Sequence, residues 1–187
     1  TGSVLAGKKI GALTTEHLKP CVLELGGSDP FIIFNDATIE DAITNGYNAR
    51  FSNNGQTCIS AKRFLIQEES FDFTLKKFIH HAKNKLCYGN PLNESTTIGP
   101  MARMDLRNQL HNQLERAKLP KDAIKFKYKP TDHSGYFTPP MIIDGRNLDY
   151  KNPLFTEETF GPIAVFDSFK TTEEAIQKAN NSAFGLG

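Results

Sequence analysis

Two residue types in this sequence could together perform covalent catalysis, a cysteine in the stretch NNGQTC and a glutamate in the stretch LELGG. A thiolate such as that of Cys58 can form a covalent adduct, and a carboxylate such as that of Glu24 can then activate the water that releases it. Cys58 follows amide side chains and a glycine, which favour loops and allow close approach to the backbone. The alternative is a buried cysteine with a packing role, since free cysteines are among the most buried residues.

Glu24 ends a predicted apolar strand, CVLEL, at residues 21–25. A carboxylate at such a position is partly desolvated, which suits a general base. Gly26 and Gly27 follow it and indicate that something approaches the backbone closely there. The alternative for Glu24 is a strand-end carboxylate in a salt bridge.

The composition places both residues in a globular protein. The chain has 187 residues, 39% of them apolar, enough for a sizeable core. Its net charge of +1 gives no long-range attraction toward nucleic acid or anionic membranes. The odd number of cysteines and the absence of a C-x-x-C pair argue against a secreted disulfide framework. With no apolar membrane span and no signal-peptide pattern, we expect a cytoplasmic protein without nucleic-acid or membrane partners.

Strands alternate with helices along the chain. Ser3 is a predicted N-cap of a first helix that ends before Pro20, and Thr38 with Asp41 resembles a capping box for the second. The alternation predicts an α/β fold with a mostly parallel sheet and helices on both faces. In such sheets ligands bind at the carboxyl ends of the strands. The remaining predicted helices cover 39–51, 71–86, 102–117 and 171–180, and the predicted strands cover 21–25, 31–34, 63–67, 123–128, 141–144 and 163–169.

Three segments in order, VLELGGSDP, NNGQTC and EETFGPIAVF, resemble the signature segments of the aldehyde dehydrogenase superfamily. TGSVLAG at the start and NNSAFGLG at the end extend the resemblance over essentially the whole chain. It implies an oxidoreductase that uses NAD or NADP to oxidise a small-molecule aldehyde to a carboxylic acid, in a homo-oligomer (dimer or tetramer). It also implies that residues 1–20 are the last helix of a cofactor-binding domain. Residues 21–187 would be a catalytic domain truncated at its C-terminus, and we expect no dehydrogenase activity from this fragment alone.

The resemblance assigns the catalytic roles. Cys58 would attack the aldehyde carbonyl to give a thiohemiacetal, and its own N–H would form half of the oxyanion hole. Glu24 would be the general base that hydrolyses the thioester, which favours water over coenzyme A as the acceptor of the acyl group. The second hypothesis is a non-catalytic α/β assembly domain in which the cysteine is structural.

The resemblance also assigns the cofactor contacts. Gly2 and Ser3 match the pyrophosphate contact, at a helix N-terminus whose N–H groups attract phosphate. Leu25 and Gly26 match the backbone near the nicotinamide carboxamide. Glu158 matches the residue that bonds the nicotinamide ribose, and Phe160 matches the ring beside the nicotinamide. On local grounds alone, Glu157 and Glu158 could instead mark a helix N-terminus or a turn.

The branch that looks most similar is that of bacterial NAD(P)-dependent succinate-semialdehyde dehydrogenases, on the stretches LELGGSDPFIIFNDA and IGPMARMDLRNQLHNQ. The arginine that binds the substrate carboxylate in that activity class would lie six residues before the nucleophile, where this chain has Ser52. Arg50 is the nearest arginine and a candidate substrate ligand. On a helix, however, two positions rotate a side chain to roughly the opposite face. Residues 118–135 lack the Gly-rich hairpin of many members, which we interpret as a surface difference.

The remaining reactive side chains have simpler interpretations. Cys21, at the start of a predicted strand, and Cys87, at the end of a helix, are predicted to be packing residues. His80 and His81 diverge by about 100° on a helix and cannot share an ion, so no metal site is predicted. The lysines of 118–129 are predicted to form a solvated surface.

Overall fold

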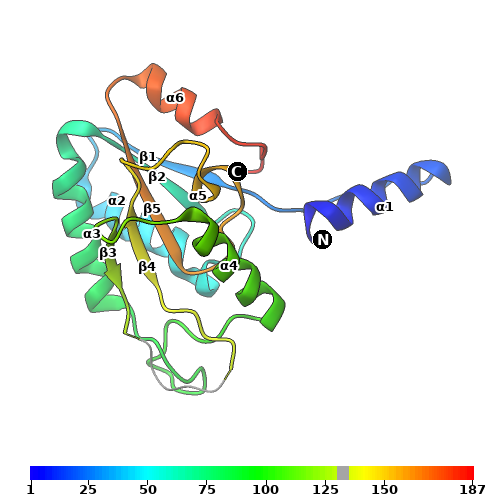
Figure 1. Ribbon diagram of the computed structural model, residues 1–187, viewed down its shortest axis with the longest axis horizontal. Coiled ribbons are helices and arrows are strands. Elements are labelled where there is room, and N and C mark those ends of the chain that lie inside the picture. The colour runs from blue at the N-terminus through cyan, green and yellow to red at the C-terminus, as the bar shows by residue number, and fades with distance from the viewer. Residues whose placement is uncertain (130–134) are drawn as a thin grey trace.

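The structure, a computed structural model, describes residues 1–129 and 135–187. A five-stranded sheet in the order β1-β2-β5-β4-β3 forms its centre (Figure 1). The pairs β1–β2, β2–β5 and β4–β5 are parallel, and β3 runs antiparallel to β4. The predicted α/β class with a mostly parallel sheet is therefore confirmed. The strands are β1 (Asp29–Ile33), β2 (Ala61–Gln67), β3 (Ile124–Lys127), β4 (Met141–Asp144) and β5 (Ile163–Phe169).

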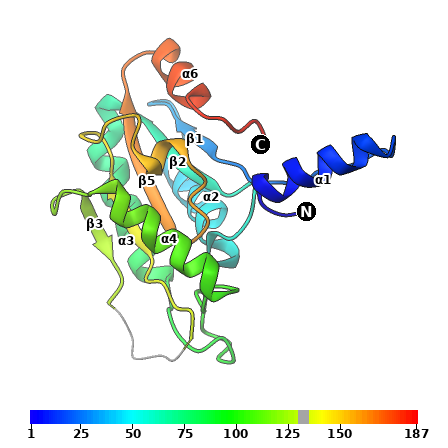
Figure 2. The same cartoon turned by 45° about the vertical axis from the view of Figure 1, so that its right-hand side comes forward.

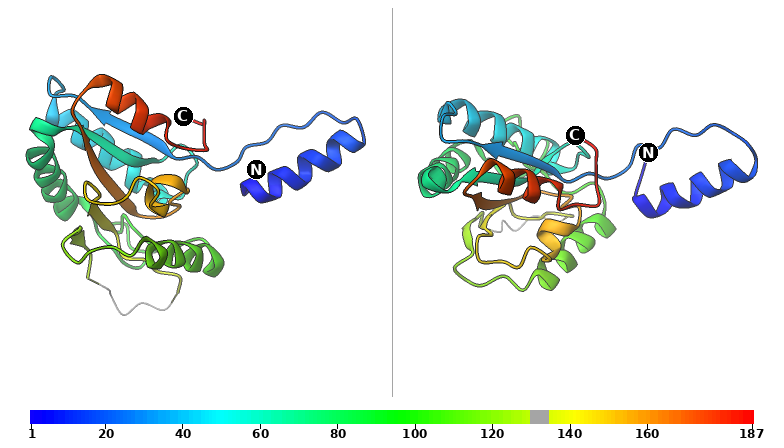
Figure 3. Two further views of the ribbon diagram at one scale, coloured as in Figure 1. Left: turned by 45° about the horizontal axis from the view of Figure 1, so that its top comes forward. Right: turned by 90° about the horizontal axis from the view of Figure 1, so that it is seen from above.

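Helices cover both faces of the sheet, as predicted (Figure 3). On β2, Phe64 and Ile66 pack toward α2 and α3, whereas Leu65 packs toward α6 on the other face. Because successive side chains of a strand alternate between faces, a strand covered on both sides is apolar throughout. The helices are α1 (Val4–Glu16), α2 (Ile39–Phe51), α3 (Phe71–Lys85), α4 (Met104–Ala117), α5 (Pro153–Thr156) and α6 (Thr172–Asn180), with single 3-10 turns η1 (Ser52–Gly55) and η2 (Glu68–Ser70).

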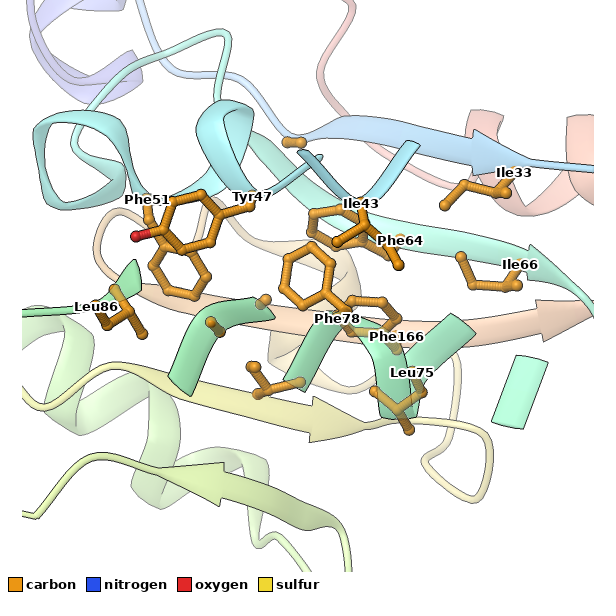
Figure 4. Packing of buried hydrophobic residues seen from close by; sticks show 14 of the residues in the cluster. Ile33, Ile43, Tyr47, Phe51, Phe64, Ile66, Leu75, Phe78, Leu86 and Phe166 are labelled. Atoms are coloured by element: carbon orange, nitrogen blue, oxygen red, sulfur yellow. The ribbon is translucent and has the colours of Figure 1, made fainter. Parts of the chain in front are cut away.

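Aromatic rings join α3 to the centre of the sheet (Figure 4). Phe64 and Phe166, on neighbouring strands, stack with their centroids 4.6 Å apart, and Phe78 of α3 meets Phe166 edge to face at 4.9 Å. All three rings are at most 1% exposed. Such pairs stabilise the core by about 0.5–1.5 kcal/mol beyond the burial of their area, so the amino-acid choice fixes α3 on this face.

The helix caps confirm one prediction and correct another. Ser3 Oγ accepts a hydrogen bond from the Ala6 N–H at 3.2 Å, as predicted for an N-cap. Thr38 stands at the N-cap of α2, but its side chain makes no cap bond, so the predicted capping box is wrong. Glu40 and Asp41 in the first turn favour the helix start instead, because acidic charges interact favourably with the N-terminal end of the helix dipole.

Two elements differ from the prediction. Residues 21–25 do not form a strand, since they pair with no other strand in the described part of the chain and Val22 is 87% exposed. The segment packs against α1 instead, with Leu25 against Gly7 and Leu23 against Gly11. The short helix α5 was not predicted, because four residues are too few for a helical period.

Helix α1 projects from the body of the molecule (Figure 1, Figure 2). Gly7 is its only buried residue, and Leu5 and Leu13 are 67% and 57% exposed. The domain division at residue 20 stays a prediction. Within the described ranges, no helix is both long and apolar enough to cross a membrane. Of the segment 118–135, residues 130–134 lie outside the described residues.

Candidate functional site

Three segments meet at the amino ends of three neighbouring strands. The LELGG segment leads into β1, NNGQTC leads into β2 and EETFGP leads into β5, and these parallel strands lie in the order β1-β2-β5. The expectation of a site at the carboxyl ends is therefore wrong. The physical reason is that each segment precedes its strand in the sequence, and parallel pairing brings equivalent ends of the strands together.

The glycine pair of the first segment lies between the other two segments. The Gly27 N–H donates to Glu158 Oε1 at 3.2 Å. A Cβ on Gly27 would collide with the Cys58 carbonyl oxygen, and a Cβ on Gly26 would collide with the Glu158 carboxylate. The expected close approach to this backbone is thus made by the chain's own residues. These contacts bring Cys58 and Glu158 together at one glycine pair.

The turn before Cys58 is left-handed at three successive residues. Asn53, Asn54 and Gly55 have φ of 51°, 57° and 69°, a conformation that Asn and Gly adopt more readily than other residues. The Asn54 Nδ2 donates to the carbonyls of Gly99 and Pro100 at 2.9 and 2.8 Å. Its Oδ1 accepts from the Gly99 N–H at 3.2 Å. The amides that predicted a loop therefore also fix that loop to the segment before α4.

Cys58 itself is half-buried, next to Ile59, which is 59% exposed. The residue is therefore neither in the apolar core nor fully in solvent, and such partial exposure is typical of reactive cysteines. Cys87 is also half-buried. Cys21 is exposed, so its predicted packing role is wrong, because the strand that would have buried it does not form.

Lys62 lies directly behind the Cys58 turn and was not predicted as a site residue. Its side chain is 0% exposed, and its Nζ donates to the carbonyls of Thr57, Cys58 and Ser60 at 3.0, 2.8 and 3.3 Å. The same atom lies 3.7 Å from Glu158 Oε1. The sequence signal that could have revealed it is the pair of adjacent cations, Lys62 and Arg63, directly before the apolar run of β2 in AKRFLIQ.

The electrostatics at Lys62 are set by its enclosure. Burial lowers the pKa of its ammonium to about 8, and the Arg50 guanidinium lowers it as well, while Glu158 and Asp29 act in the opposite direction. Burial also raises the pKa of the Asp29 carboxyl, against the opposing charges of Lys62 and Arg63. Three cations, Arg50, Lys62 and Arg63, and two carboxylates, Asp29 and Glu158, therefore interact close to the Cys58 turn.

Arg50 is not available to a substrate. It is 0% exposed, and its guanidinium donates to Ala61 O at 3.3 Å, Gly55 O at 3.1 Å and Thr159 O at 3.2 Å, and also to Gly161 O. The candidate role of Arg50 as a substrate ligand is thus contradicted. Its contacts connect the start of β2 and the turn before Cys58 to the segment before β5.

In the sequence, Phe160 lies between Thr159 and Gly161, whose carbonyls both accept hydrogen bonds from Arg50. Phe160 is half-buried. Glu157, next to it in sequence, forms an exposed bidentate pair with Arg116 at 2.6 Å, whereas the Glu158 carboxylate turns inward to Gly27. The two adjacent glutamates therefore have different partners, a surface arginine for Glu157 and the Gly27 backbone for Glu158. The helix N-terminus interpretation is wrong, because Glu157 follows α5 as its C-cap.

Glu24 lies beside the start of α1, where its carbonyl oxygen accepts from the Gly2 N–H at 3.0 Å. Its side chain is exposed, so the expected desolvation at a strand end is not found. The structure brings Gly2 and Ser3 close to the LELGG segment, and Leu25 packs against Gly7 of the same helix. The predicted cofactor residues at the start of α1 therefore lie close to those of the LELGG segment.

The arrangement fits a dinucleotide. The first turn of α1 carries no acidic side chain, which leaves its N-terminus open to a phosphate. Gly26 has no side chain beside the Glu158 carboxylate, which is 23% exposed and can accept a hydrogen bond from a sugar hydroxyl. Among residues 1–129 and 135–187, no group of three or more metal-binding side chains occurs.

Comparison with known proteins gives one consistent family. The family model described as "Aldehyde dehydrogenase family" matches residues 1–187. A succinate semialdehyde dehydrogenase (NAD(P)+) of Escherichia coli is 41% identical over 186 residues, and a succinate-semialdehyde dehydrogenase (NADP(+)) of Mycobacterium avium is 38% identical over 187 residues. Each match covers 100% of this chain, and the chain spans 40% and 39% of the length of these relatives.

Solved structures agree with the sequence comparison. The betaine aldehyde dehydrogenase of Staphylococcus aureus, in complex with NAD+, superposes with a TM-score of 0.88 at 31% identity. The match covers 99% of this chain and 37% of that one. The fold of this chain is therefore the fold of the corresponding part of that protein.

Proposed function

The chain belongs to the aldehyde dehydrogenase family, and from that premise we propose that its protein oxidises an aldehyde to a carboxylic acid with NAD(P)+. The observation that carries the proposal is that Cys58 and Glu158 both contact the Gly26-Gly27 pair. Relatives named as NADP(+) or NAD(P)+ enzymes support the choice of cofactor. Because the chain spans about two fifths of these relatives, the activity is proposed for the full-length protein.

In the proposed reaction the Cys58 thiolate attacks the aldehyde carbon, and a carbon–sulfur bond forms as the carbonyl oxygen becomes an oxyanion. The Cys58 N–H donates to that oxyanion. When bound, NAD(P)+ would supply the acceptor for the hydride that leaves the former aldehyde carbon. Loss of that hydride converts the adduct into a thioester on Cys58. Glu24, which is exposed, takes a proton from the water that attacks the thioester, and the acid leaves as the carbon–sulfur bond breaks and the thiol is released.

The remaining predicted residues would bind the cofactor. Gly2 and Ser3 would meet the pyrophosphate at the start of α1, and Glu158 would accept a hydrogen bond from the nicotinamide ribose. Leu25 and Gly26 would lie near the carboxamide, and Phe160 beside the nicotinamide ring. We propose in addition that the full-length protein is a cytoplasmic homo-oligomer, a dimer or a tetramer.

The hydrolytic step is tested by Glu24→Gln in the full-length protein. We expect a rapid first turnover of NAD(P)H formation to persist while steady-state turnover falls about 10²- to 10⁴-fold, the usual contribution of a general base. Glu16→Gln, an exposed glutamate in α1, is the matched control and should keep full turnover. Unchanged turnover in Glu24→Gln would remove the hydrolytic role, and unchanged turnover in Cys58→Ser would favour the non-catalytic assembly domain.

For the substrate we propose a semialdehyde such as succinate semialdehyde, on the names of the two similar relatives. Ser52 is exposed and uncharged, and Arg50 is 0% exposed with its two terminal nitrogens on backbone carbonyls, so neither supplies a cation for the substrate carboxylate. The carboxylate must then be bound elsewhere in the full-length protein. The ratio of kcat/KM for succinate semialdehyde to that for an uncharged aldehyde of equal length decides the point, and a ratio below one refutes the semialdehyde.

A further inference from the structure

Lys62 is enclosed at the base of the Cys58 turn, four residues after the cysteine. Its side chain is 0% exposed. Burying an ammonium costs several kcal/mol unless hydrogen bonds and opposite charges compensate for lost hydration. A lysine buried in β2 therefore needs a specific local reason.

The hydrogen bonds of Lys62 all end on one turn. An ammonium has three N–H donors, and the three acceptors within 3.3 Å are the carbonyls of Thr57, Cys58 and Ser60. These carbonyls fix the backbone on both sides of the Cys58 Cα. The Glu158 carboxylate at 3.7 Å is beyond hydrogen-bond distance, so it interacts with Lys62 as a charge.

The charges around Lys62 come from every segment that packs on it. Arg50 faces it from α2, Asp29 from β1, and Glu158 from the segment before β5, and Cys58 is the fourth group that interacts with it electrostatically. The site segments, residues 24–29, 50–63 and 157–162, contain no histidine. A neighbouring cation is the other common means by which proteins stabilise a thiolate.

We propose that Lys62 is a positioning residue for Cys58, whose ammonium both holds the nucleophile turn and stabilises the thiolate. The proposal rests on the proposed function, because it concerns the reactivity of the same cysteine. Glu158 partly offsets the effect of Lys62, since its negative charge lies next to the same ammonium. A change at Glu158 should therefore act on the thiolate with the opposite sign.

The test measures the rate of iodoacetamide alkylation at each cysteine against pH by peptide mass spectrometry, on the full-length protein. In Lys62→Met, alkylation of Cys58 at pH 6.5 should be about tenfold slower, the size of effect that a nearby opposite charge has on a titration. Lys62→Arg keeps the charge and should stay within about threefold of the wild type. Cys21 and Cys87 serve as internal references whose rates should not change.

Lys178→Met is the matched control. Its ammonium also bonds a carboxylate, Asp167 at 2.8 Å, and a backbone carbonyl, that of Ser168 at 2.5 Å, but it lies in α6. It should leave the alkylation profile of Cys58 unchanged. An equal slowing in Lys178→Met and Lys62→Met, or no slowing in Lys62→Met, overturns the proposal.

Glu158→Gln keeps the test decisive if Lys62→Met does not fold. Removing this carboxylate should make Cys58 alkylation faster at pH 6.5, because the ammonium then acts on the thiolate without the opposing charge. A slower rate overturns the proposal.

Failure of the proposed function is seen separately, as full dehydrogenase turnover in Cys58→Ser. If Cys58→Ser loses turnover but Lys62→Met shows a normal rate of Cys58 alkylation, only the proposed role of Lys62 is refuted.

Discussion

Replacing Arg50 by methionine should destabilise the fold strongly, because its guanidinium is a structural connection between two site segments. Four backbone carbonyls would lose their donor, those of Gly55, Ala61, Thr159 and Gly161. Each buried acceptor without a partner costs about 1–3 kcal/mol. The simple sum overstates the loss, since removing a buried cation also removes its desolvation cost. The expected net loss is about 3–5 kcal/mol, the usual effect of breaking a buried charged network.

The assay is urea unfolding of the 187-residue chain followed by far-UV circular dichroism, since the sequence contains no tryptophan. Arg103→Met is the matched control. Arg103 is 67% exposed and pairs with Asp105 at 2.6 Å, so its loss should leave the free energy of unfolding close to that of the wild type. The comparison therefore separates a buried arginine that connects segments from one in a surface pair.

A substrate role for Arg50 makes a different prediction. It would raise the KM for a carboxylated aldehyde in the full-length protein and leave the free energy of unfolding near that of the wild type. If Arg50→Met lies within about 1 kcal/mol of Arg103→Met, the structural interpretation of Arg50 is refuted.

Three further changes test other parts of the structure. Asn54→Ala should cost about 2–4 kcal/mol in urea unfolding, because it removes three hydrogen bonds to residues 99–100. Thr171→Ala should lower the thermal stability by about 1 kcal/mol, whereas Thr38→Ala, which removes no cap bond, should cost clearly less. Burial lowers the pKa of Lys62 from 10.5 to about 8, so between these pH values the unfolded state binds more protons and stability rises with pH. Relative to Lys62→Met, the wild type should gain up to about 3 kcal/mol from pH 8 to 10.5, and a flat difference in pH-dependent urea unfolding would contradict this.

Local pattern was sufficient for most of the fold. The strands MIID and IAVFDSF were predicted with their observed bounds, because continuous apolar runs are typical of strands that are covered on both faces. The segment CVLEL is similarly apolar but is not a strand. A strand also needs a partner, and a partner is a long-range property that composition does not carry.

The edge of the sheet that holds the site was predicted wrongly for a related reason. The rule that ligands bind at carboxyl ends applies to loops that follow strands, whereas Glu24, Cys58 and Glu158 all precede theirs. Their order in the sequence already contained this information. Parallel pairing of β1, β2 and β5 then brings the three segments together whatever ligand they bind.

The residues that support the site were the least predictable part. Gly26 and Gly27 indicated that something approached the backbone, but only the fold shows that Cys58 and Glu158 do so. Arg50 was predicted as a candidate substrate ligand, and Lys62 lay just before the predicted strand 63–67, yet both are 0% exposed. Their acceptors are backbone carbonyls, which every residue has, so no sequence motif can mark them. A charged residue that must be buried because of its position in a helix or strand is the one local sign of such a role. In β2 it points to the adjacent pair Lys62 and Arg63, which are 0% and 3% exposed.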